Sequence, residues 1–148
     1  MTGGKKKMKK YYILFVFTCI LLVSCGKKEI PKLTTFNPVT YAFKTDDTWD
    51  VQASIQVKGF TQKKEKETYL VKMFYTVDLV KPNGNVVKGV IKDTIDEENT
   101  EEFIDLPINV QFELDSTYSV GKYKVIYNIK DAFSNQQLKS EKDLELTE

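Results

Sequence analysis

Histidine and arginine are both absent from this 148-residue chain, so all 22 of its basic residues are lysines. The lack of histidine excludes Ser-His-Asp triads and Cys-His dyads. The only cysteines are Cys19 and Cys25, which are too few for a structural zinc cage when histidine is missing. The seven glycines are scattered and form no phosphate-binding loop. These absences predict a protein that is not an enzyme and that holds no metal or dissociable cofactor.

Charge is unevenly distributed. Five lysines and no acids lie in residues 1–24, which leaves 17 lysines against 21 acids and a net charge of −4 in the rest of the chain. A mildly acidic domain without arginine is poorly suited to neutralising phosphates or reading bases. The sequence therefore predicts no nucleic-acid partner.

The first 24 residues have the plan of an export signal. Residues 1–10 are lysine-rich, with Met8 as an alternative start, and Tyr11–Val23 is an apolar run of 13 residues. A helix of that length reaches about 20 Å, short of the roughly 30 Å hydrocarbon layer of a membrane. The run therefore indicates a signal peptide and not a transmembrane span.

The segment Leu22-Val23-Ser24-Cys25 resembles the lipobox of bacterial lipoproteins. This resemblance implies cleavage between Ser24 and Cys25, diacylglycerol on the Cys25 thiol and, usually, an acyl chain on the new amino terminus. It divides the chain into a signal peptide (1–24), a lipid-anchored tether (25–33) and a folded domain (34–148). An ordinary signal peptide cut nearby, or an uncleaved anchor, are the alternatives.

The residue that follows the cysteine bears on location. Gly26 departs from the aspartate that retains enterobacterial lipoproteins at the inner membrane, which implies the outer membrane in a Gram-negative cell. Lys27 and Lys28 do not match the acidic surface-export signal of some lipoproteins, so a periplasm-facing position is favoured. In a Gram-positive cell the same anchor lies on the outer face of the cell membrane.

Alternation of apolar and polar residues dominates the chain after the tether and predicts antiparallel strands with one buried face. The clearest strands are expected at 49–58, 68–80, 108–114 and 122–130, and further ones at 35–43, 86–92 and 137–146. The strand at 68–80 is apolar on both sides and is therefore expected to be central or covered. Aromatic residues are expected mainly in the core. About seven short strands predict an all-β fold, a single antiparallel two-sheet sandwich.

The C-terminal third resembles bacterial immunoglobulin-like or macroglobulin-type domains. The resemblance rests on Phe112–Leu114, on Gly121-Lys122-Tyr123, on Asp131 and on Leu144–Leu146. It implies an immunoglobulin-like sandwich in which Tyr123 opens the penultimate strand and hydrogen-bonds across the corner. A fainter resemblance, in size, anchor and the Leu79–Gly84 turn, is to a gliding-motility lipoprotein family, whose tryptophan-rich middle has no match here.

Acidic residues are densest between positions 93 and 105, where Asp93, Asp96, Glu97 and Glu98 are weak candidates for a calcium site. Their order fits no EF-hand spacing, and a solvated connection is the preferred interpretation. Paired carboxylates among the 21 acids leave glycoside hydrolysis open, although so small a sandwich seldom has the necessary cleft.

Three aromatic residues lie in or beside predicted turns, where binding often occurs, and are candidates for partner contact: Phe60, Tyr118 and Phe133. Two functions remain open at this point. The first is a non-catalytic accessory module of the cell envelope with a protein partner. The second is a carrier of a small ligand, held in an apolar cavity beside 68–80 or by the loops. Oligomeric state is not predicted.

Overall fold

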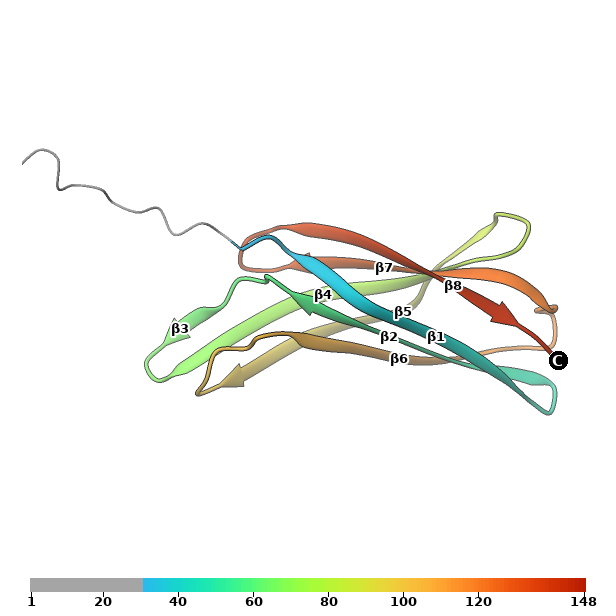
Figure 1. The fold of residues 1–148 in the computed structure, drawn as a ribbon, viewed down its shortest axis with the longest axis horizontal. Helices are drawn as coiled ribbons and strands as arrows, with labels where there is room; N and C mark the ends of the chain where they lie inside the picture. Colours follow the sequence, from blue (N-terminus) through green and yellow to red (C-terminus); the bar gives the residue numbers. More distant parts are fainter. Residues whose placement is uncertain (1–30) are drawn as a thin grey trace, which may run out of the picture.

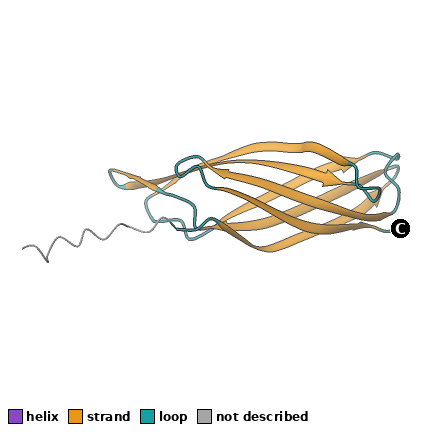
Figure 2. Ribbon diagram, turned by 90° about the horizontal axis from the view of Figure 1, so that it is seen from above, coloured by secondary structure: helices purple, strands orange, loops and turns teal. Residues whose placement is uncertain are grey.

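The computed structural model describes residues 31–148, which form eight β-strands and no helix (Figure 2). All seven predicted strands are present. The eighth, β3, was missed because it is three charged residues long. The predicted signal peptide and Cys25 lie outside the described residues. The strands are β1 (Thr34–Thr45), β2 (Thr48–Lys58), β3 (Lys63–Glu65), β4 (Thr68–Val80), β5 (Val86–Asn99), β6 (Leu106–Leu114), β7 (Gly121–Asp131) and β8 (Gln137–Leu146).

The strands form two antiparallel sheets, which confirms the predicted all-β, two-sheet class. One sheet has the order β1-β2-β6, and the other has β3-β4-β7-β8 with β5 on the free side of β4. The sheets lie against each other along their length (Figure 1). Strand β1 is next to β8, where the Thr40 hydroxyl donates to the Asp143 carbonyl oxygen at 2.6 Å.

Inward side chains from both sheets make one core. From β2 it takes every second residue, from Trp49 to Val57, as the alternation predicted. Strand β4 is central: it pairs with β5 on one side and with β3 and β7 on the other. Its odd-numbered residues from Val71 to Leu79 are buried in the core, whereas Phe74 on the other face is 44% exposed. That second face is therefore not covered at Phe74.

Strand β5 is longer than predicted, because it continues through the acidic residues to Asn99, which pairs with Tyr69. The prediction of a connection from residue 93 was wrong here, since backbone pairing with β4 overrides the low strand propensity of Asp and Glu. Charged residues on both faces suit an exposed edge strand, because they oppose pairing with other chains.

A bulge bends β5 near its start. Residues 88–90 lie opposite the single residue Asp78, and Gly89 has a φ of +62°. The buried Asp78 carboxylate accepts hydrogen bonds from the Gly89 amide at 2.7 Å and from Asn128 Nδ2 at 3.0 Å. These bonds tie the bulge to the centre of the sheet.

The turn that joins β7 to β8 is organised by Asp131, which is fully buried. Its carboxylate accepts hydrogen bonds from the amide of Thr61 at 2.7 Å, from the Ser134 hydroxyl at 2.6 Å and from the amides of Phe133 and Ser134 at 2.8 and 3.3 Å. Burial raises the pKa of Asp131, but these four bonds outweigh it and hold the pKa below its usual value. The residue therefore fastens the β2–β3 connection to the β7–β8 turn.

The beginning of the domain is held in place by Gln136. Its side-chain oxygen accepts from the Leu33 amide at 3.1 Å, and its amide nitrogen donates to the Pro31 carbonyl at 2.9 Å. Leu33, which the sequence analysis placed in the tether, is 3% exposed and belongs to the core. Gly59 permits this docking, because a Cβ there would lie 2.0 Å from the Lys32 carbonyl oxygen. Among residues 31–148, the buried apolar side chains extend from Leu33 to Leu146 and form one core cluster, apart from Ile126 on the other face of β7.

Candidate functional site

An apolar row on the outer face of β1 is the most prominent surface feature of the described residues. Val39, Tyr41 and Phe43 are 49%, 51% and 45% exposed, and Phe36 lies on the same face. Asn37, with a φ of +50°, and Pro38 form an irregularity that keeps Phe36 and Val39 on one side although they are three positions apart. We refer to Phe36, Val39, Tyr41 and Phe43 as the β1 row.

These side chains face outward because the inward positions of β1 hold small residues. Thr35, Thr40 and Ala42 lie on the core side, opposite Val57, Ala53 and Val51. The Thr35 hydroxyl reaches Ser140 of β8 at 3.0 Å, an approach that a phenyl ring would prevent. The expectation that aromatic residues lie mainly in the core is therefore wrong for the β1 row.

The rest of this face is polar and largely uncharged. Next to the β1 row, β2 and β6 present the outward residues Asp50, Gln52, Ser54, Gln56, Lys58, Pro107, Asn109, Gln111 and Glu113. The Tyr41 hydroxyl donates to the Gln52 side chain, and Gln111 Nε2 donates to Asp50 at 2.8 Å. Lys58 Nζ lies 5.0 Å from the centre of the Phe36 ring. Charge is thus confined to the ends of the face.

The exposed area of the row can be compared with that of known contact patches. A half-exposed Tyr or Phe leaves about 100 Å² of its surface in water. With Val39 the row therefore approaches the roughly 300 Å² at which an exposed apolar patch often marks a contact site. Aromatic residues surrounded by few charges are also typical of the centre of protein–protein interfaces. We take the outer face of β1, β2 and β6 as the candidate contact face.

The structure does not bring together the three aromatic residues predicted from turns. Phe60 is 3% exposed and packs in the core, so the prediction that it offers a surface contact is corrected. Its position follows Gly59, whose φ of +73° turns the chain at the end of β2. Tyr118 and Phe133 lie beyond opposite ends of β7, because Tyr118 precedes Gly121 and Phe133 follows Asp131.

Tyr118 and Phe133 are both half-buried and locally packed. The Tyr118 carbonyl accepts from Trp49 Nε1 at 3.0 Å, and its ring lies 4.3 Å from Lys81 Nζ. Phe133 lies 4.3 Å from Lys63 Nζ in the same way. Each ring therefore lies against a lysine side chain of another segment.

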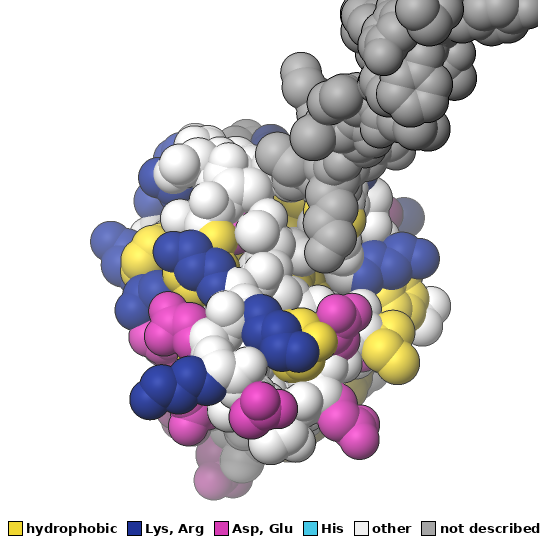
Figure 3. All heavy atoms as spheres, turned by 90° about the vertical axis from the view of Figure 1, so that its left-hand side faces the viewer, with side chains coloured by type: hydrophobic (Ala, Val, Ile, Leu, Met, Phe, Trp, Pro, Cys, Tyr) yellow, Lys and Arg dark blue, Asp and Glu magenta, His cyan; other side chains and the backbone are white. Residues whose placement is uncertain are grey.

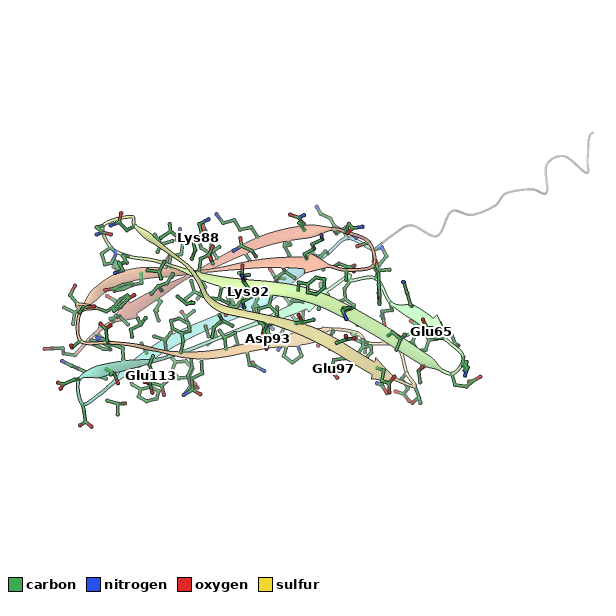
Figure 4. All side chains as sticks on the ribbon, turned by 180° about the vertical axis from the view of Figure 1, so that it is seen from behind. Glu65, Lys88, Lys92, Asp93, Glu97 and Glu113 are labelled. Atoms are coloured by element: carbon green, nitrogen blue, oxygen red, sulfur yellow. The ribbon has the colours of Figure 1, made fainter. Side chains whose placement is uncertain are left out.

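The acidic candidates for a cation site lie along β5, where Figure 4 labels Asp93 and Glu97. Asp96 and Glu98 lie on the opposite face of the strand, because their register partners are Lys72 and Leu70. Asp93 lies beside Tyr75, whose hydroxyl is 3.4 Å from the carboxylate, and Asp96 pairs with Lys72 at 2.5 Å. Burial, and then the negative charge of Asp93, raise the pKa of Tyr75. Within residues 31–148, no three or more acidic or metal-binding side chains are grouped as ion ligands.

The end of the sandwich where the described chain begins carries lysine and acidic side chains side by side (Figure 3). The hairpin of β3 and β4, with Lys63, Lys64 and Glu65, lies at this end (Figure 1). No helix of the part described here is long and apolar enough to cross a membrane.

No protein-family model and no curated protein matches the chain. The solved structures that match it include the following two. A structural-genomics target solved by X-ray crystallography is 12% identical, with a TM-score of 0.36, over 80% of this chain and 87% of its own. A protein from Archaeoglobus fulgidus is also 12% identical, with a TM-score of 0.30, over 79% and 97%.

Proposed function

We propose that the chain is a membrane-anchored lipoprotein whose β-sandwich is a non-catalytic binding and accessory module of the cell envelope. The resemblance of Leu22–Cys25 to a lipobox supports the anchor. The observation that carries the binding role is the β1 row, whose exposed apolar side chains have no function in the core. In this proposal the module contacts an envelope protein through the face of β1, β2 and β6.

The proposal includes an immunoglobulin-like sandwich, and two observations support it. The sheet β1-β2-β6 opposite β5-β4-β7-β8, with β3 as an addition, shares the antiparallel two-sheet architecture of such sandwiches, although β5 pairs with β4 and not with β6 as the fourth strand does in the constant-type order. The Tyr123 hydroxyl donates to the Ser119 carbonyl at 2.8 Å at the start of β7. This bond has the form of the tyrosine corner of such domains.

The anchor gives the module a defined position. Residues 25–30 reach at most about 20 Å when extended. A lipid on Cys25 therefore holds the Pro31 end of the sandwich close to the bilayer. In a Gram-negative cell the proposed place is the periplasmic side of the outer membrane, and in a Gram-positive cell it is the outer face of the cell membrane.

A small-ligand carrier is the weaker candidate. It was expected to use the apolar residues of 68–80 as a cavity wall, but Val71, Met73 and Val77 are each 0% exposed within the core. The contact face therefore has the better support.

Photo-crosslinking in intact membranes tests the proposal. A benzophenone amino acid replaces Tyr41 in one variant and Lys139, on the exposed face of β8, in a matched control. We expect a discrete crosslinked protein band from position 41 and none from position 139. Equal crosslinking from both positions, or none from position 41, would overturn the assignment of the contact face.

A further inference from the structure

Strands β1 and β2 of the contact face have a nearly palindromic arrangement around Ser54. On β2, Gln52 and Gln56 lie two residues to either side of Ser54, and Asp50 and Lys58 lie four residues to either side. On β1, the partners of Gln56, Ser54 and Gln52 are Phe36, Val39 and Tyr41. The β1 side chains are therefore aromatic, aliphatic and aromatic in order. This order is as symmetric as the amide, hydroxyl and amide order on β2. Opposite charges occupy the two ends.

We propose that this face is self-complementary and that its partner is a second copy of the chain. The inference rests on the proposed function only in taking the face as a contact surface. A two-fold axis in the plane of the sheet, across the strands at Ser54, places Lys58 of each copy opposite the Asp50 end of the other. Phe36 then meets Tyr41 of the second copy, and Val39 meets Val39. Such an isologous contact closes on itself as a dimer.

Charge selects this axis over the other in-plane axis. An axis along the strands would place Lys58 at the same end as Lys58 of the second copy and both Asp50 carboxylates together at the other end. Like charges that face each other across an interface are costly. The antiparallel arrangement instead places Lys58 opposite Asp50, with Glu113, the β6 register partner of Asp50, one strand to the side.

The area of the face indicates a weak dimer. Three strands at about 4.8 Å spacing and nine residues at about 3.3 Å give roughly 400 Å² per copy. A stable interface needs about 800 Å² per partner. The contact is therefore concentration-dependent in solution. Attachment to one membrane raises the effective concentration and favours it. Because the copies run antiparallel, both anchors reach one bilayer when the strands lie parallel to its plane.

Sedimentation equilibrium of residues 26–148, which include the core cluster from Leu33 to Leu146, tests the charge pattern at protein concentrations from about 10 μM to 1 mM. We expect self-association that weakens at least fivefold in Lys58→Glu and in Asp50→Lys. An equimolar mixture of the two variants restores it, because each then supplies the charge that the other lacks. A monomeric wild-type chain at the highest concentration, or a mixture no stronger than either variant, would overturn the proposal.

A cysteine crosslink tests the axis itself. Residues 26–148 contain no cysteine, so a Val39→Cys variant carries one thiol. Because Val39 lies on the proposed axis, we expect mild oxidation to give disulfide-linked dimers several-fold faster than in Lys139→Cys. Equal rates would refute the axis. If position 41 crosslinks a different protein while the chain stays monomeric, the proposal of a second copy is refuted, whereas the assignment of the contact face is supported.

Discussion

Asp131 provides the sharpest test of the fold, because one carboxylate joins two connections. In Asp131→Asn the side chain keeps its shape and can still accept from the Phe133 and Ser134 amides. Its new NH₂ group, however, faces the Thr61 amide, which donated to the carboxylate at 2.7 Å. Loss of a hydrogen bond to a charged group, with a buried donor left unpaired, costs about 2–3 kcal/mol.

Urea unfolding followed by the fluorescence of Trp49 measures this effect. Trp49 is the only tryptophan and is 3% exposed, so its emission reports on the core. We expect the midpoint to fall with little change in the slope of the unfolding free energy against urea. The control Asp143→Asn changes an exposed carboxylate and should stay within about 0.5 kcal/mol of wild type. A loss below about 1 kcal/mol for Asp131→Asn would refute this account of the turn.

We also expect the difference in unfolding free energy between wild type and Asp131→Asn to depend on pH. The pKa of Asp131 is lower in the folded than in the unfolded state. Its stabilisation is therefore complete above the unfolded pKa of about 3.9 and is lost as the pH falls through the lower folded pKa. The gap between wild type and Asp131→Asn should narrow from pH 7 to pH 3. A constant gap would contradict the assignment.

The remaining predictions use matched pairs of substitutions, again measured by urea unfolding. Tyr123→Phe loses the bond to Ser119 and should cost about 1 kcal/mol, whereas Tyr127→Phe removes a buried hydroxyl without a partner and should be neutral or stabilising. Equal losses of stability in the two variants would contradict the assignment of a hydrogen bond to the Tyr123 hydroxyl and of none to the Tyr127 hydroxyl. Gly59→Ala should cost more than 2 kcal/mol from its clash with Lys32, and Gly84→Ala, also at positive φ but in open space, about 1 kcal/mol. A larger loss of stability in Gly84→Ala than in Gly59→Ala would refute this prediction.

Much of the fold was predictable because most strands alternate clearly and end at strong turns. Strand β4 and the turn Lys81–Asn85 illustrate this: Gly84 adopts a φ of +84°, and its amide donates to the Lys81 carbonyl at 2.9 Å. Strand β3 was missed because it contains no apolar residue. The acidic half of β5 was missed because its strand conformation comes from pairing with β4 and not from its own composition.

The candidate contact face could not be found from alternation alone. A period of two shows that the β1 row shares one side of a strand, but it does not tell which side is buried. The small residues Thr35, Thr40 and Ala42 on the other side were the available signal. They become informative only once β1 is known to lie close against β8.

The placement of the module depends on Cys25, and intact mass spectrometry of the protein extracted from membranes tests it most directly. The account predicts a mature chain that begins at Cys25 and carries diacylglycerol on its thiol, with the mass of one or more further acyl chains where the amino terminus is modified. A Cys25→Ala variant should keep an uncleaved leader and carry no lipid. An unlipidated wild-type chain, or one that begins at another residue, would contradict the proposed anchor.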